Sequence, residues 1–148
     1  MVIGIIGESC TGKSTIAEEL SKRLNAVVYA GKDYLKLSKN EADAKKQFAD
    51  LLNRSAGGDD AVIYVITETE HLSLLPPAAT RILLTAELDI IKERFARRMG
   101  GRLPPPVEAM LEKKHGMFDN ERCDLRFDSI SGDSAEICDR IVAAACKI

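Results

Sequence analysis

The clearest chemical signal is the octapeptide Gly-Glu-Ser-Cys-Thr-Gly-Lys-Ser over residues 7–14, which matches the pattern G-x-x-x-x-G-K-[ST]. Gly7 and Gly12 permit backbone angles that other residues resist, so successive main-chain N–H groups can converge on one phosphate. Lys13 places a cation where a helix N-terminus disfavours one, which makes sense if a polyanion binds there. The Ser14 hydroxyl can bind the Mg²⁺ that bridges two phosphates.

The surroundings of this loop fit a phosphate site better than the alternative, a glycine-rich turn that only caps a helix. An apolar run at residues 2–6 precedes the loop, as expected of a buried strand. Residues 13–24 carry apolar side chains at helical spacing. We therefore expect the loop to bind the phosphates of a nucleotide through Gly7, Glu8, Ser9, Cys10, Thr11, Gly12, Lys13, Ser14 and Thr15.

A second group suited to phosphate chemistry lies in residues 92–102, where five basic side chains accompany one acid. Arg94 shares a helix face with Arg97 and Arg98, which crowds like charges unless an anion binds there. Arginine makes bidentate contacts with phosphate, and a phosphoryl group in transfer spreads negative charge over its oxygens. A solvated basic helix end is the alternative. We expect a catalytic role for Arg94, Arg98 and Arg102.

These groups must be positioned by a chain whose strand and helix patterns alternate, which predicts a mostly parallel sheet with helices on both faces. Residues 38–60 and 99–118 do not feed the sheet directly, and we expect them above its carboxyl edge, where ligands bind. The chain breaks at Gly100-Gly101 and at the prolines 104–106. Asp133 and Glu136 predict a capping box for a final helix. Strands are predicted at 2–6, 27–29, 61–66, 81–85 and 125–127, and the other helices at 13–24, 40–53, 87–98 and 107–118.

With these features the chain resembles the small P-loop kinases, which include shikimate kinase and nucleoside monophosphate kinases such as adenylate and cytidylate kinases. The resemblance rests on the loop 7–14, the helix 87–98 with the segment 99–106, and the strand and helix at 125–147. It implies an α/β, three-layer P-loop NTPase fold with a five-stranded parallel sheet of order 2-3-1-4-5. It also implies ATP as donor, Mg²⁺, and a small mobile lid.

The resemblance divides the chain into functional segments of one domain. It implies a single P-loop kinase domain over residues 1–148. Within it, residues 38–60 would bind the acceptor, and residues 99–118 would form the lid and the helix that follows.

Two acids follow predicted strands. Asp33 resembles the acidic residue that small-metabolite kinases carry after the second strand, where it can orient an acceptor hydroxyl or a magnesium-bound water. A loop aspartate that starts a turn is the alternative. Glu68 takes the place of the Asp that many P-loop proteins have after the third strand, and the Asp-Gly pair of monophosphate kinases is missing here. We expect catalytic roles for Lys13, Asp33 and the three arginines, and metal ligation by Ser14, Asp33 and Glu68.

Composition disfavours several other classes of protein. The 148 residues, 45% hydrophobic and 30% charged, fit one soluble globular domain. A 5% aromatic content without Trp argues against a stacking platform for single-stranded nucleic acid, and a formal charge of −2 against a basic duplex binder. No apolar run approaches the roughly 20 residues of a membrane span. The opening residues lack a signal-peptide pattern, so we expect a cytoplasmic protein without nucleic-acid or membrane partners.

The predicted function is transfer of the γ-phosphoryl group of ATP to a small-molecule acceptor, which is a nucleotide, a nucleoside or a hydroxylated metabolite. A phosphate acceptor needs only cationic clamps, whereas a hydroxyl acceptor benefits from a carboxylate such as Asp33. Two alternatives remain open: a nucleotide-binding regulatory module, and a degenerate kinase that binds ATP without catalysis. A GTP switch is disfavoured because the motifs N-K-x-D and D-x-x-G are both missing from the sequence. The sequence does not indicate an oligomeric state.

Overall fold

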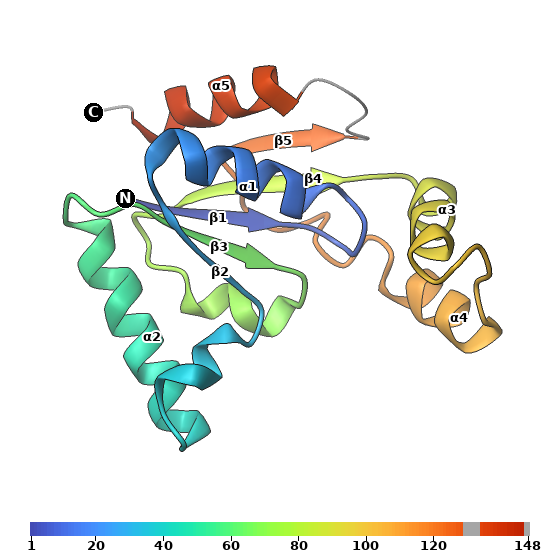
Figure 1. Ribbon diagram of the computed structural model, residues 1–148, viewed down its shortest axis with the longest axis horizontal. Coiled ribbons are helices and arrows are strands. Elements are labelled where there is room, and N and C mark those ends of the chain that lie inside the picture. Colours follow the sequence, from blue (N-terminus) through green and yellow to red (C-terminus); the bar gives the residue numbers. More distant parts are fainter. Residues whose placement is uncertain (129–133, 147–148) are drawn as a thin grey trace.

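The computed structural model describes residues 1–128 and 134–146, which form a five-stranded sheet with helices on both faces (Figure 1). Neighbouring strands pair in parallel, in the order β2-β3-β1-β4-β5. This confirms the predicted fold class and strand order. The strands are β1 (Val2–Ile6), β2 (Val27–Ala30), β3 (Val62–Ile66), β4 (Thr80–Thr85) and β5 (Leu125–Asp128).

The two central strands, β1 and β3, are buried along their whole length. Their sequences, VIGII and VIYVI, are rich in β-branched residues, which suit strands covered on both faces. The register pairs Val2 with Val62 and Ile6 with Ile66, so both strands end at the same level. The loops that follow them therefore start side by side at the carboxyl edge of the sheet.

Successive side chains of β1 enter two separate cores, because side chains alternate across a strand. Ile3 and Ile5 pack under helices α1 (Lys13–Leu24) and α5 (Ser134–Ala145). Val2 and Ile6 belong to the core on the opposite face. Figure 1 shows α1 and α5 on one side of the sheet and α2 (Glu41–Ala56) on the other.

Residues 38–60 were expected above the carboxyl edge of the sheet, but helix α2, which forms most of this segment, lies against one face of the sheet. It is the crossover helix between β2 and β3, and its buried side chains Ala44, Phe48 and Leu52 pack against the sheet core. These residues recur every four positions, which gives the helix one apolar face long enough to cover the sheet. Only the 3₁₀ turn before it, η1 (Asp33–Leu37), follows directly from the carboxyl end of β2.

Helices α3 (Leu88–Arg98) and α4 (Pro105–Lys114) form a hairpin beyond the carboxyl ends of the strands (Figure 1). A small core of its own, centred on Ala86, Ile91 and Leu111, holds the pair together. The chain breaks between the two helices as expected, but Pro105 and Pro106 lie inside the first turn of α4, because proline lacks only an N–H that this turn leaves unpaired. Helix α4 consequently starts and ends earlier than predicted.

Asp133, the predicted N-terminal residue of a capping box, lies outside the described residues, so the structure does not test that cap. A second 3₁₀ turn, η2 (Thr69–Leu74), follows β3 and was not predicted. Among the helices of the described segments, none is both long and apolar enough to span a bilayer.

Candidate active site

The loop between β1 and α1 has the tight main-chain path that its glycines predict. A Cβ added at Gly7 would lie 2.5 Å from the main-chain oxygen of Leu84 and 2.7 Å from Thr11 Oγ1, so only glycine fits there. Gly12, with φ of 96°, turns the chain into α1 through the left-handed region. The Gly7 N–H donates to Ile66 O at 3.1 Å, which fixes the loop to the end of β3.

Helix α1 begins inside the loop with its first amides available for an anion. Gly12 provides no side-chain cap, and the first turn contains no acid. The first N–H groups of any helix lack partners within the helix and carry the positive end of its dipole. Ser14 and Thr15, at this end, are both exposed. The loop therefore has the architecture of a phosphate site.

Lys13 is the most strongly perturbed group of this loop. Its side chain is only 6% exposed, and its Nζ donates to the main-chain oxygen of Glu8 at 2.5 Å. The pKa of Lys13 is lowered to about 8, chiefly by burial; the positive charge of Arg98 adds to this shift, and Cys10 and Glu8 oppose it. A buried ammonium held by a carbonyl gains most from an anion, because phosphate oxygens would compensate for its lost hydration.

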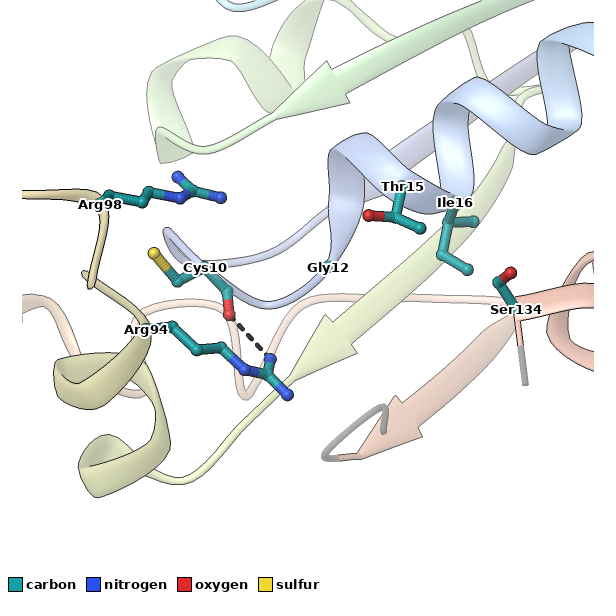
Figure 2. A pocket seen from close by; sticks show the side chains of 7 residues that line it. All are labelled: Cys10, Gly12, Thr15, Ile16, Arg94, Arg98 and Ser134. Carbon is teal, nitrogen blue, oxygen red and sulfur yellow. Dashed lines mark hydrogen bonds between the residues drawn. The ribbon is translucent and has the colours of Figure 1, made fainter. Parts of the chain in front are cut away.

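A cavity of about 340 Å³ opens beside the loop. Figure 2 shows Arg94 and Arg98 extending from α3 toward the loop that carries Cys10. Arg94 Nη1 donates to Cys10 O at 2.9 Å, which joins α3 to the loop across 84 residues of sequence. The α3 arginines and the loop thus border one hollow, which is lined by Cys10, Gly12, Thr15, Ile16, Arg94, Arg98 and Ser134.

The other predicted residues lie at varying distances from this hollow. Arg102 is exposed in the turn between α3 and α4, outside the set of residues that line it. Asp33 begins η1, and its Oδ2 accepts from the Ala30 N–H at 2.9 Å. Arg97, the basic neighbour that the sequence did not favour, pairs with Glu93 at 2.6 Å on the exposed side of α3.

A second cavity, of about 130 Å³, lies between the loop of residues 7–14 (the predicted phosphate loop), the end of β3 and the α3–α4 hairpin. Glu68 borders it and accepts from Lys114 Nζ at 2.9 Å, so this carboxylate carries an ion pair that the sequence did not predict. The lining is otherwise mostly apolar, and comprises Glu8, Ser9, Thr67, Glu68, Phe95, Met110, Leu111, Lys114 and Met117.

Sequence reasoning missed the side-chain role of Glu8. Its carboxylate accepts from the Gly116 N–H at 3.1 Å and lies 3.1 Å from His115 Nδ1, at the end of α4. The chemical type of the residue could have indicated this role, because a carboxylate in an anion-binding loop is unfavourable unless it has other partners. Nothing local in the sequence identified those partners, which are more than 100 positions away.

The predicted metal-binding residues offer oxygen ligands, which fit Mg²⁺ rather than a softer metal. Ser14 offers a hydroxyl, and Asp33 and Glu68 offer carboxylates at the ends of β2 and β3. Mg²⁺ prefers such oxygen ligands and commonly needs only one or two from the protein, with phosphates and water completing its shell. Across residues 1–128 and 134–146, no group of three or more His, Cys, Asp and Glu residues could hold a metal alone, so a bound phosphate would have to contribute.

The chain matches no protein-family model, and no curated protein sequence matches it significantly. Solved structures do match. A gluconokinase from Sinorhizobium meliloti superposes with a TM-score of 0.61 and 17% identity, covering 97% of this chain and 90% of that one. A shikimate kinase from Acinetobacter baumannii, in complex with shikimate, superposes with a TM-score of 0.63 and 14% identity, covering 97% of this chain and 91% of that one.

A third match is the YorR protein from Bacillus subtilis, solved in complex with phosphorylated GDP. Its TM-score is 0.63 and its identity 23%, covering 97% of this chain and 95% of that one. At these identities the three matches show a shared fold. The predicted resemblance is therefore confirmed at the level of the fold.

Proposed function

We propose that this chain, which has the fold of the small P-loop kinases, transfers the γ-phosphoryl group of ATP to a small-molecule acceptor. One observation carries the proposal: Arg94 and Arg98 line the cavity at the N-terminus of α1, the helix that begins at the buried Lys13, and the charge of Arg98 helps to lower the pKa of Lys13. Three cations near the unpaired amides of one helix end repel one another unless an anion binds between them. A chain of phosphates would supply that negative charge.

On the donor side, the loop amides and Lys13 would hold the terminal phosphates of ATP. The guanidinium groups of Arg94 and Arg98 would neutralise charge on the oxygens of the phosphoryl group in transfer. Bound Mg²⁺, held by Ser14 with Asp33 or Glu68, would supply further charge compensation. Phosphoryl transfer depends mostly on such positioning and electrostatics, so these residues suffice for the donor half.

On the acceptor side, the cavity between Ser9 and Glu68 favours a hydroxyl over a phosphate. Lys114 is the one cation among its lining residues, and it is already paired with Glu68. An acceptor phosphate would have to break that pair, whereas a hydroxyl could donate a hydrogen bond to the carboxylate. The apolar walls from α4 suit the carbon skeleton of a small metabolite.

The test is ADP release with and without a panel of hydroxylated metabolites, nucleosides and nucleotides. We expect release that depends on at least one hydroxylated acceptor and falls on the order of 100-fold in Lys13→Met. Release that ignores every acceptor would contradict the proposal and favour a regulatory module. Nucleotide binding without any transfer would favour a degenerate kinase.

A further inference from the structure

The Glu8 side chain contacts a segment far from the loop to which it belongs. Its side chain is 10% exposed. Oε2 accepts from the Gly116 N–H and Oε1 lies within hydrogen-bonding distance of His115 Nδ1, both at 3.1 Å. Both oxygens are thus engaged by the chain immediately after α4.

The main chain of Glu8 makes contacts of a different kind. Its carbonyl oxygen accepts from Lys13 Nζ at 2.5 Å and from Thr11 Oγ1 at 2.8 Å. One residue therefore contacts the lysine of the phosphate loop through its backbone and the end of α4 through its side chain. A single, buried residue therefore joins Lys13 to the end of α4.

The segment bonded by Glu8 is the base of the α3–α4 hairpin. Gly116, with φ of 83°, turns the chain after α4, and Phe118, 2% exposed, then enters the main core. At the other base of the hairpin, Ala86 follows β4 directly. The orientation of α3, and with it the position of Arg94 and Arg98, depends on how both bases are held.

We infer that Glu8 is a positioning residue: its carboxylate holds the α3–α4 hairpin against the phosphate loop so that Arg94 and Arg98 meet the bound phosphates. The effect of Glu8 on catalysis rests on the proposed function, whereas its contact with the end of α4 does not. The competing expectation is simple electrostatics. A carboxylate in the loop would repel the nucleotide, and removing it would then strengthen binding.

The two expectations predict opposite results for Glu8→Ala. The probe is Mg²⁺ with adenylyl imidodiphosphate, titrated calorimetrically into the full chain. Positioning predicts binding at least fivefold weaker in Glu8→Ala, with partial recovery in Glu8→Gln, which keeps an oxygen acceptor for the Gly116 N–H. Tighter or unchanged binding in Glu8→Ala would overturn the inference. Glu93→Gln, on the exposed side of the same hairpin, is the matched control and should bind as the wild type does.

Amide hydrogen exchange separates this contact from catalysis and from general loss of folding. In Glu8→Ala we expect the Gly116 amide to exchange at least tenfold faster, while the amides of β1 and β3 keep their protection. Unchanged exchange at Gly116 would overturn the inference. If exchange and binding change as expected but no acceptor supports ADP release, the kinase proposal fails while the positioning role of Glu8 stands.

Where turnover is measurable, the kinetic pattern gives a further readout. A displaced hairpin predicts a kcat for Glu8→Ala lowered at least tenfold, more than the KM for the acceptor is raised. Rescue by Glu8→Gln is expected to be partial. A wild-type kcat in Glu8→Ala would contradict the positioning role.

Discussion

Arg94 Nη1 donates to the main-chain oxygen of Cys10 at 2.9 Å, which places an arginine of α3 against the phosphate loop. The donor and acceptor are 84 residues apart in sequence. The contact exists because α3 follows β4, the neighbour of β1, so that both carboxyl ends open onto the same space. This contact brings a helix rich in basic residues to the loop that we propose as a phosphate site.

The first prediction concerns this arginine. Arg94→Ala should lower turnover on the order of 100-fold, because the guanidinium would compensate charge in a partly buried site. Arg97→Ala, three residues along the helix, should change turnover little, since Arg97 is exposed and paired with Glu93. Steady-state kinetics of ADP release measures both. Equal losses in the two variants would indicate a general effect of helix charge.

A second prediction follows from the pKa of Lys13, which burial lowers to about 8 in the free protein. Bound phosphates would raise this pKa again, so nucleotide affinity should stay constant below about pH 8. Above it, affinity should fall by up to about tenfold per pH unit, because the free protein must take up a proton to bind. Titration calorimetry near pH 9, in buffers of different ionisation enthalpy, should detect this uptake. Binding without proton uptake at that pH would contradict this account of Lys13.

The third prediction tests the path of the loop through Gly7. Gly7→Ala should destabilise the fold by about 2 kcal/mol, because the new methyl group would lie 2.5 Å from the Leu84 carbonyl oxygen. Gly57→Ala is the control: φ is −98° and no atom lies within 4 Å of the added carbon, so the change should stay within about 0.5 kcal/mol. Urea denaturation compares the two. Equal stabilities would mean that the loop can relax around a side chain.

The fourth prediction concerns His71, which is 2% exposed and packs against the rings of Tyr34 and Tyr64. Neither ring nitrogen has a hydrogen-bond partner within the described part of the chain. His71→Leu should therefore stabilise the protein by about 1 kcal/mol, since it removes buried polar atoms without creating a large cavity. Thermal unfolding at neutral pH measures the change. A clear loss of stability would show that the ring has a stabilising polar partner, for which Glu70 Oε1, 3.7 Å from Nε2, is the candidate.

The features that the sequence predicted well are local. The phosphate loop is specified within eight residues, and the strand before it and the helix after it have patterns that depend on neighbouring side chains alone. The strand order came from the resemblance, because no local pattern determines which strands pair.

The features that the sequence did not predict depend on distant contacts. The carboxylate of Glu8 meets Gly116 across 108 positions, and Glu68 meets Lys114 across 46. Neither pair has the i, i+3 or i, i+4 spacing by which helix pairs are recognised. The start of α4 at Pro105, two residues before the predicted one, has another cause: a proline cluster can precede a helix or form its first turn, and the sequence alone does not distinguish the two.

Calorimetric titration of Mg²⁺ and adenylyl imidodiphosphate into the wild type and Lys13→Met, at pH 7, tests the central claim most directly. We predict one nucleotide bound per wild-type chain and binding on the order of 100-fold weaker in Lys13→Met, because the variant removes one partner of a buried charge pair. Equal affinity in the two proteins, or no binding to the wild type, would contradict the assignment of residues 7–14 as a nucleotide phosphate site.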